Sequence, residues 1–326
     1  MSETLETVLL TGGTGLAGSA VLRELLATRA GIRVRIPYRS EDGLFISDPR
    51  VEYVRANLFE ASDCARVVAG CEFAIHTAAQ TGGAHQTSKM PWLQVTPNIV
   101  ADTLLLQALY DAKVMKLIYI SSATVYQNFS GIISENQLNY GLDPQTIHFG
   151  VGWAKRSAEK LCRFWHEVGG MKIIVVRPSN IYGPAAQFLP QNSNFIAALV
   201  RKAVDKMDPF EVWGSPDIER NILYADDFGK AVVDLMNYVD IGFDVFNLGS
   251  GENVKVSEIV ELVLRYSGHT PSKTLFSELN QMAIQRKMLD CTKIIKLLGW
   301  SPITTPEVGI QKTIKWWLEN KDSWKK

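Results

Sequence analysis

Short apolar runs alternate with longer amphipathic stretches through the first half of the chain. The runs are rich in β-branched residues and bounded by Gly, Asp or Ser, which predicts strands at residues 7–10, 32–37, 51–54, 73–76, 117–120 and 173–176. Helical spacing of apolar positions predicts helices between them, at about residues 16–28, 61–69, 93–112 and 153–168. Strands that are apolar on both faces and separated by helices are typical of a parallel sheet covered on both sides. The pattern therefore predicts an α/β fold.

The texture of the sequence changes after Arg177, where prolines and shorter segments replace the regular alternation. This part predicts helices near residues 195–206, 226–238, 256–266 and 306–319, and strands near residues 211–213 and 245–248. We expect residues 1–177 to form the main domain and residues 178–326 to form mainly a smaller lobe. We expect this lobe to be interleaved with the last strands of the sheet rather than joined to it by a linker.

Composition narrows the class of protein. The chain has 326 residues, 46% of them hydrophobic, and its 34 Lys and Arg residues balance 34 Asp and Glu residues. A chain without net charge or a dense basic stripe argues against a nucleic-acid partner. No apolar stretch approaches the length of a membrane span, and the acidic N-terminus lacks the basic start of a signal peptide. We therefore expect a cytoplasmic protein with no membrane partner.

Cysteine and histidine residues give no sign of a metal site. The four cysteines form no CxxC pair, and the five histidines show neither HExxH nor another ligand spacing. We expect reduced, buried thiols and no metal.

Residues 7–18, TVLLTGGTGLAG, read as a strand, a glycine loop and the start of a helix. Gly12 would allow a tight turn, Gly15 a close approach of the backbone to a pyrophosphate, and Gly18 close packing of the helix on the strand. The N–H groups at the head of the helix would face the phosphates, with Thr14 and Leu16 beside them. The motif predicts an NAD(P)-type dinucleotide on a Rossmann-type, doubly wound parallel sheet, with residues 1–177 as its main binding domain.

The residues after the second strand bear on the choice of cofactor. Arg39 and Ser40 stand where an NAD-binding protein usually has an acidic residue for the ribose hydroxyls. A guanidinium binds a phosphate with two hydrogen bonds, so we expect NADP, with Arg39 on the 2′-phosphate. Glu41 and Asp42 follow immediately and keep NAD open, and Arg39 could alternatively be a solvated loop charge.

With these motifs in order, the chain resembles the extended short-chain dehydrogenase/reductase family of NAD(P)-dependent nucleotide-sugar epimerases, dehydratases and reductases. The matching segments are the glycine loop, HTAA at 76–79, Asn98, SSATVY at 121–126, RPSNIYGP at 177–184 and LGWSP at 298–302. The resemblance implies further cofactor contacts at Asn57, Leu58, Ala78, Ala79, Lys155, Pro178, Asn180 and Ile181.

Within this family the second half most resembles the GDP-L-fucose synthases, through residues 192–202 and the segment VWGSP at 212–216 followed by Arg220. That likeness implies a nucleoside-diphosphate sugar of the GDP-4-keto-6-deoxy-hexose kind, bound by Thr124, Asn180, Asn194, Lys202, Trp213, Arg220 and Arg286. Physically, Lys202 and Arg220 could neutralise a diphosphate, and Trp213 could cover a base or a sugar. A surface cation and a core aromatic would explain the same residues.

The catalytic motif of the family is altered in this chain. The family carries Tyr and Lys as YxxxK on one helix face, and the Tyr moves the proton that accompanies hydride transfer. Here Lys155 and Glu159 fit KxxxE, but the residue four before Lys155 is Val151, which has no titratable proton. In an alternative register Trp153 supplies only an indole N–H, which cannot act as a base. The remaining catalytic candidates are Ser122, Lys155 and His148.

A second departure concerns epimerisation. The GDP-L-fucose synthases carry a Cys and a His where this chain has Thr124 and Ala185, and neither can do that acid–base work. Three alternatives remain: a sugar-nucleotide enzyme with an atypical active site, a catalytically impaired NADP-binding sensor or scaffold, or a different redox step. We favour an enzyme because Ser122, Lys155 and the lobe motifs are present. The family also implies a homodimer through the helices at 93–112 and 153–168, although helices that merely cover the sheet would show the same pattern.

Overall fold

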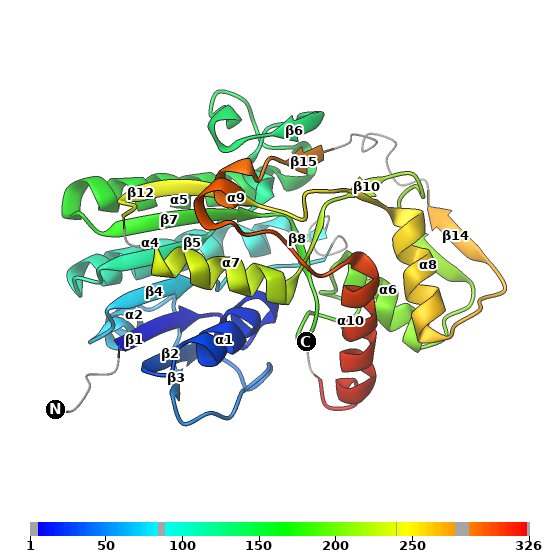
Figure 1. Ribbon diagram of the computed structural model, residues 1–326, viewed down its shortest axis with the longest axis horizontal. Coiled ribbons are helices and arrows are strands. Elements are labelled where there is room, and N and C mark those ends of the chain that lie inside the picture. The colour runs from blue at the N-terminus through cyan, green and yellow to red at the C-terminus, as the bar shows by residue number, and fades with distance from the viewer. Residues whose placement is uncertain (1–5, 84–88, 239, 278–286, 325–326) are drawn as a thin grey trace.

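A seven-stranded parallel sheet forms the centre of the protein, as Figure 1 shows. The computed structural model describes residues 6–83, 89–238, 240–277 and 287–324. The sheet runs in the order β12-β7-β5-β4-β1-β2-β3. Its strands are β1 (Glu6–Thr11), β2 (Ile32–Tyr38), β3 (Val51–Arg55), β4 (Phe73–His76), β5 (Lys116–Ile120), β7 (Lys172–Pro178) and β12 (Phe243–Leu248). This confirms the predicted Rossmann-type fold. The strand order reverses between β1 and β4, which is where such sheets bind ligands.

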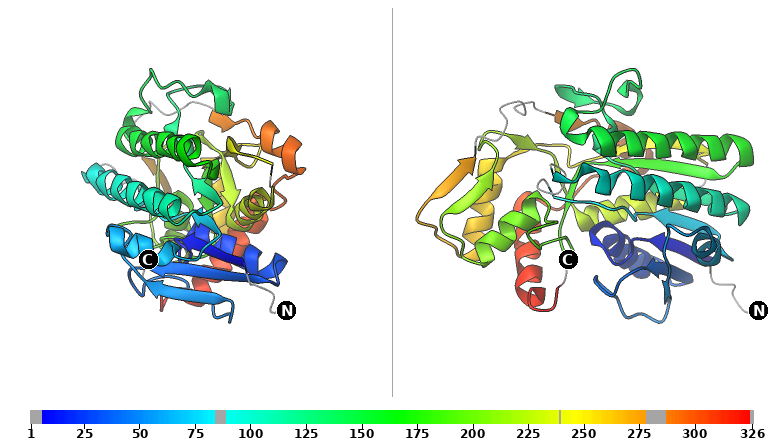
Figure 2. Two further views of the ribbon diagram at one scale, coloured as in Figure 1. Left: turned by 90° about the vertical axis from the view of Figure 1, so that its left-hand side faces the viewer. Right: turned by 180° about the vertical axis from the view of Figure 1, so that it is seen from behind.

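Helices cover both faces of the sheet (Figures 1 and 2). On one face α1 (Leu16–Thr28) packs against α7 (Ala225–Asn237), and on the other α2 (Ala61–Val68), α4 (Thr96–Asp111) and α5 (Phe149–Gly169) pack in a row. A Cβ atom at Gly229 would lie 2.7 Å from the Ala20 carbonyl oxygen, so glycine allows the close approach of α7 to α1. The two faces bury separate apolar clusters, which explains why the strands are apolar on both sides.

A smaller lobe lies at the carboxyl ends of the strands, on the right of Figure 1. It contains α6 (Phe195–Val204), β9 (Phe210–Trp213), α8 (Val256–Ser267), β14 (Thr274–Ser277) and α10 (Pro306–Asn320), with β14 parallel to β9. Its core includes Phe188 stacked on Trp317 at 4.3 Å between ring centroids. Between α7 and α8 the chain returns to the central sheet as β12.

Shorter elements connect these two parts. The strands are β6 (Gly131–Ile133), β8 (Asn180–Tyr182), β10 (Glu219–Arg220), β11 (Ile222–Tyr224), β13 (Val254–Lys255) and β15 (Lys287–Leu289). The helices are α9 (Thr292–Leu298) and the 3₁₀ helices η1 (Pro91–Gln94), η2 (Ala123–Val125), η3 (Glu135–Gln137) and η4 (Thr146–His148). Among the described residues, no helix is both long and apolar enough to cross a membrane.

Two predicted helices differ from the structure at their first turns. The helix predicted from residue 153 begins four residues earlier, at Phe149. Its first turn contains Gly150 and Gly152, which are poor helix formers but which close packing requires at these positions. A Cβ at Gly152 would lie 2.6 Å from the Thr124 carbonyl oxygen, and one at Gly150 would lie 2.7 Å from a Val95 methyl group. The helix predicted over 93–112 is divided, since α4 starts afresh at Thr96 with a proline in its first turn.

Candidate active site

The glycine loop lies between the carboxyl ends of β1 and β4, at the point where the strand order reverses. Gly12 has φ +71°, and a Cβ there would lie 2.7–2.9 Å from Thr77 and Ala78. A Cβ at Gly18 would lie 2.2 Å from the Gly12 carbonyl oxygen. Both glycines are therefore required by the fold itself, Gly12 for the turn and Gly18 for packing of α1 on the loop.

Gly15 differs from the other two glycines of the motif. A Cβ there would meet only the Gly12 carbonyl oxygen at 3.5 Å, an ordinary contact, and its φ of −102° suits any residue. It caps α1, whose first N–H groups have no partner within the helix. The fold does not need glycine here, whereas a phosphate group approaching the helix N-terminus would, so the loop fits a dinucleotide pyrophosphate.

Thr14 and Leu16 complete the loop. Thr14 is buried, and its carbonyl oxygen accepts a hydrogen bond from the Leu44 N–H at 2.9 Å, which ties the segment after β2 to the loop. Leu16 is half-buried and packs against the core of the smaller lobe. The loop is therefore tied both to the segment after β2 and to the core of the smaller lobe.

The predicted adenosine end lies beyond β2 and β3. Arg39 is exposed, and its guanidinium carbon lies 5.4 Å from the centre of the Phe59 ring. Asn57 accepts a hydrogen bond from the Phe59 N–H at 3.3 Å through Oδ1, and Leu58 between them is half-buried. The structure thus brings Arg39, Asn57 and Leu58 to one edge of the sheet, and among the described residues the Arg39 guanidinium forms no ion pair.

Ala78 and Ala79 follow β4, and Ala78 is half-buried beside Gly12 whereas Ala79 is exposed. Asn98 on α4 fixes the chain just beyond them. Its Oδ1 accepts from the Gln80 N–H at 2.7 Å, and its Nδ2 donates to the carbonyl oxygens of Gln80 at 3.0 Å and Gln94 at 2.7 Å. This asparagine is therefore a backbone clamp that holds the segment after β4 in place.

Lys155 projects from α5 toward the end of β5 and is 5% exposed. Its Nζ donates to the Tyr119 hydroxyl at 2.9 Å and to the Ile120 carbonyl oxygen at 3.0 Å. Val151 lies one turn earlier on the same helix and is half-buried. Trp153 does not replace the missing phenol, because its indole N–H donates to Asp143 at 3.0 Å and its ring lies 4.8 Å from the Arg156 guanidinium.

Ser122 and Thr124 lie in the turn that follows β5. The Ser122 Oγ accepts a hydrogen bond from the Thr124 N–H at 3.1 Å, and the Thr124 hydroxyl is buried without a partner among the described residues. The next strand, β7, ends at Pro178, which is buried, and leads into the half-buried Ile181 and the exposed Asn180. The Asn180 Nδ2 donates to the Asn221 carbonyl oxygen at 3.0 Å, so this side chain is already held by the lobe.

A buried ion pair lies beneath this turn. Glu159 on α5 accepts two hydrogen bonds from the Arg177 guanidinium, at 2.9 and 2.6 Å, and both side chains are 3% exposed. Ser121 donates to the same carboxylate at 2.5 Å, and Arg177 also donates to the Tyr126 hydroxyl at 3.0 Å. Burial alone would lower the pKa of Arg177, but the bonds to Glu159 raise it, so the guanidinium stays charged. The pair joins α5 to β7.

We expect Glu159→Gln to lower the free energy of unfolding by about 3–5 kcal/mol, because it leaves the Arg177 guanidinium buried without its counter-charge. Unfolding in urea measures the change. The control is Glu167→Gln on the same helix, where the pair with Arg163 is more than half exposed and little change is expected. Equal losses in both variants would contradict a special role for the buried pair.

A group of cations lies where the lobe meets the start of α5. Burial lowers the pKa of Arg220, and burial together with Arg220 lowers the pKa of Lys287. His148, at the start of α5, is half-buried, and burial followed by the charges of Arg220 and Lys287 lowers its pKa, so the imidazole is neutral at pH 7. Arg220 makes no side-chain hydrogen bond or ion pair within the described part of the chain. The arrangement suits an anionic ligand.

Other predicted substrate contacts lie on the lobe. The Lys202 Nζ donates to the Glu211 carbonyl oxygen at 2.8 Å and lies 5.8 Å from the Trp213 ring, which is 50% exposed. Asn194 is exposed at the start of α6. Arg286 lies outside the described residues. Ala185, in the position of the family's histidine, is 1% exposed with φ +60° and offers no acid or base.

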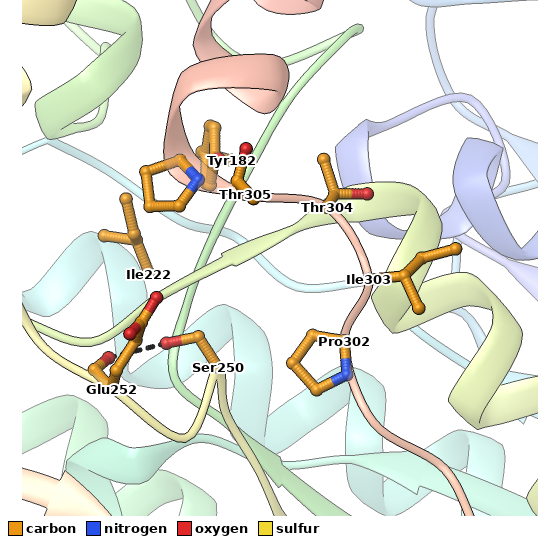
Figure 3. Close-up of a pocket in the computed structure, with 9 residues that line it drawn as sticks. Tyr182, Ile222, Ser250, Glu252, Pro302, Ile303, Thr304 and Thr305 are labelled. Carbon is orange, nitrogen blue, oxygen red and sulfur yellow. Dashed lines mark hydrogen bonds between the residues drawn. The ribbon is translucent and has the colours of Figure 1, made fainter.

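Sequence reasoning did not identify Lys287, which the fold places near His148 and Arg220 by pairing β15 with β6. No local pattern marks it, because the two strands are far apart in sequence. A separate small pocket lies beneath the segment that leads into α10 (Figure 3). It is lined by Tyr182, Ile222, Ser250, Glu252 and residues 302–306. It contains none of the predicted site residues.

The fold and the loop define a class of protein, and comparison with known proteins agrees. Residues 8–249 match the NAD dependent epimerase/dehydratase family, and the chain belongs to this family of enzymes. Relatives include "Probable GDP-L-fucose synthase 1" of Oryza sativa subsp. japonica, 31% identical over 98% of this chain and 94% of the relative. GDP-L-fucose synthase of Escherichia coli (strain K12) is 26% identical over 97% of this chain and 98% of the relative. These matches confirm the predicted resemblance.

Solved structures share the fold. UDP-glucose 4-epimerase of Thermotoga maritima, solved with UDP-glucose, matches with a TM-score of 0.84 and 22% identity over 97% of this chain and 99% of that chain. A dTDP-glucose 4,6-dehydratase of Streptomyces venezuelae, solved with NAD, matches with a TM-score of 0.84 and 23% identity over 98% and 99%.

Proposed function

We propose that the protein is an NAD(P)-dependent epimerase or reductase acting on a nucleoside-diphosphate sugar of the GDP-4-keto-6-deoxy-hexose kind, with an atypical active site. The observation that carries this proposal is the pair of half-buried cations, Arg220 and Lys287, beside the start of the helix that bears Lys155. Lys287 donates to the Asn128 side chain at 2.8 Å, and neither cation has a carboxylate partner among the described residues, so a bound diphosphate would compensate their charges. The likeness to GDP-L-fucose synthases supports the choice of sugar nucleotide.

On the cofactor side, the head of α1 would hold the pyrophosphate and Arg39 the 2′-phosphate of NADP. When bound, the nicotinamide supplies the hydride. Lys155 has three N–H donors, of which two are used by Tyr119 and Ile120, so the third is available to a ribose hydroxyl. Pro178, Asn180 and Ile181 would line the same end of the site.

On the substrate side, Arg220, Lys287 and Lys202 would neutralise the diphosphate, and the exposed Trp213 would cover the base or the sugar. The Ser122 hydroxyl would donate a hydrogen bond to the reacting oxygen. Because Val151 has no proton to give, we assign proton transfer to the neutral imidazole of His148, directly or through a water molecule.

Val151 also favours a second candidate function, a catalytically impaired NADP-binding sensor or scaffold. Such a protein would be stabilised by the nucleotide without turnover. The two functions differ in one measurement. The protein is incubated with NADPH and a panel of 4-keto-6-deoxy sugar nucleotides, and both NADPH oxidation and isomeric products are followed. The enzyme consumes NADPH, or forms an isomeric product without net consumption, with at least one substrate. Thermal stabilisation by NADPH without any turnover across the panel would reject the enzyme and leave the sensor.

Arg39 gives a test of the cofactor. We expect the native protein to bind NADP more tightly than NAD, and Arg39→Ala to reduce this preference by about 10–100-fold, because a charge-assisted bond to the 2′-phosphate is lost. Titration calorimetry with both nucleotides measures it. Arg33→Ala is the matched control, since Arg33 is an exposed arginine on β2, the strand that Arg39 follows, and its contact is Glu52. A native preference for NAD would refute the role given to Arg39.

We also propose a homodimer formed through α4 and α5, as the family resemblance implies. Apolar side chains remain exposed on both helices, among them Ile99 at 39%, Phe164 at 48% and Val168 at 55%. Burial of such side chains against a second copy would remove them from water. Sedimentation of the native protein and of a Phe164→Glu variant would test the contact.

A further inference from the structure

A chain of buried polar side chains runs behind the nucleotide crevice, starting at the end of β1. The Thr11 Oγ1 lies 2.6 Å from the His76 Nδ1, and the His76 Nε2 lies 2.8 Å from an Asp102 carboxylate oxygen. Thr11, His76 and Asp102 are 1–2% exposed. Asp102 is therefore a carboxylate on the buried face of α4, where a charge is stable only if it is compensated.

This series of hydrogen bonds continues from Asp102 to Lys155. The Tyr119 hydroxyl donates to the second Asp102 oxygen at 2.7 Å and accepts from the Lys155 Nζ at 2.9 Å. Tyr119 is fully buried on β5. No carboxylate among the described residues forms a direct ion pair with Lys155, so the nearest charge of opposite sign along its hydrogen bonds is Asp102, one phenol away.

The hydrogen bonds of this series place its two opposite charges. The Thr11 hydroxyl accepts from the Ala78 N–H at 3.3 Å and contacts the His76 Nδ1, while the His76 Nε2 contacts Asp102. The Asp102 carboxylate and the Lys155 ammonium lie at either side of the Tyr119 hydroxyl, which bonds to both.

Two modes of action are conceivable for such a chain, proton transfer or electrostatic positioning. Burial, followed by the charge of Asp102, raises the pKa of Tyr119 well above its usual value. Burial alone would raise the pKa of Asp102, but Lys155, His76 and Tyr119 together lower it. The phenol keeps its proton beside an ionised carboxylate, so the series at rest holds two separated opposite charges that fix the Lys155 ammonium, and we take positioning as its role.

We propose that Asp102 is the counter-ion of Lys155 and a positioning residue for the nicotinamide half of the nucleotide site, acting through the Tyr119 hydroxyl. Lys155 has one donor left after its bonds to Tyr119 and Ile120, and the fixed ammonium directs that donor to the ligand. Because Thr11 leads into the glycine loop, the same chain ties the pyrophosphate end of the site to the lysine. The proposal rests on the proposed function for the identity of the ligand.

A double-mutant cycle tests this coupling with NADPH as the probe. Asp102→Asn, Lys155→Met and the double variant are compared by titration calorimetry and by thermal unfolding without nucleotide. We expect Asp102→Asn to weaken NADPH binding at least about tenfold in the native background and less than about twofold in the Lys155→Met background. The double variant should unfold at a higher temperature than the sum of the two single losses predicts, because both buried charges are gone.

A second variant covers the case in which Asp102→Asn does not fold. Tyr119→Phe keeps both charges and removes only the hydroxyl between them, and it should weaken NADPH binding to a similar extent. The control is Tyr126→Phe, which removes the buried hydroxyl bonded to Asn247 at 2.6 Å and should change stability but not NADPH affinity.

The outcomes separate this proposal from the proposed function. Equal effects of Asp102→Asn in both lysine backgrounds, or native NADPH affinity in Asp102→Asn or Tyr119→Phe, would overturn the positioning role even in an active enzyme. Coupled effects in a protein that binds NADPH but turns over no sugar nucleotide would support the positioning role while rejecting the proposed enzyme.

Discussion

We expect Val151→Tyr to raise the turnover number for a 4-keto sugar nucleotide by about 10²–10⁴-fold, the usual contribution of a positioned general acid or base. Residue 151 lies one helical turn before Lys155 on α5, so a tyrosine there would share its helix face. Val151 is only half-buried, so a larger side chain can be accommodated at this position. Single-turnover oxidation of NADPH in the presence of substrate measures the change.

Val151→Phe is the matched control for this experiment. It adds the ring without the hydroxyl, so an increase in the tyrosine variant alone would assign the gain to proton transfer. In a combined variant, Lys155→Met should remove most of that gain, because the lysine would no longer stabilise the phenolate. If Val151→Tyr and Val151→Phe turn over at the native rate, the missing phenol is not what limits this enzyme.

Gly15→Val should reduce the affinity for NADP and NADPH at least about 100-fold, because its side chain would occupy the space of the pyrophosphate. The folded protein itself accommodates a Cβ at this position, with its nearest neighbour at 3.5 Å. We therefore expect near-native thermal stability without nucleotide and no stabilisation when nucleotide is added. Calorimetric titration and thermal unfolding provide the two measurements.

Gly31→Val is the control for Gly15→Val. Gly31 precedes β2, and a Cβ there would meet nothing within 4 Å, so the same substitution should leave both folding and binding unchanged. Gly18→Val should instead fail to fold, since its Cβ would lie 2.2 Å from the Gly12 carbonyl oxygen. Nucleotide binding by Gly15→Val with native affinity would refute the assignment of the loop to the pyrophosphate.

The central sheet could be predicted from the sequence because its information is local. Each strand is a short apolar run, and the glycine loop fixes the first strand, the first helix and the crevice between them. The start of α5 could not be predicted in this way. Its two glycines look like helix breakers in sequence, and only the neighbouring Thr124 and Val95 explain why they are needed.

The series of hydrogen bonds from Thr11 to Lys155 could not be predicted from the sequence, for a different reason. Its members come from three strands and two helices, and each hydrogen bond joins residues that are 17 to 65 positions apart. One signal was present, since Asp102 shares the apolar face of its helix with Leu105 and Leu109, where a carboxylate is unusual. Its partners could be found only after the strands were placed side by side.

Because the chain returns to the sheet as β12, this protein cannot be divided into two independent parts by a single cut. A fragment ending at Arg177 would lack β12, so β7 would become an edge strand. Its unpaired backbone N–H and C=O groups could then pair with a second copy of the fragment. The smaller lobe likewise draws its pieces from both sides of β12. Exchange of the smaller lobe between relatives therefore requires several grafts at once, and we expect the product of a single crossover to self-associate.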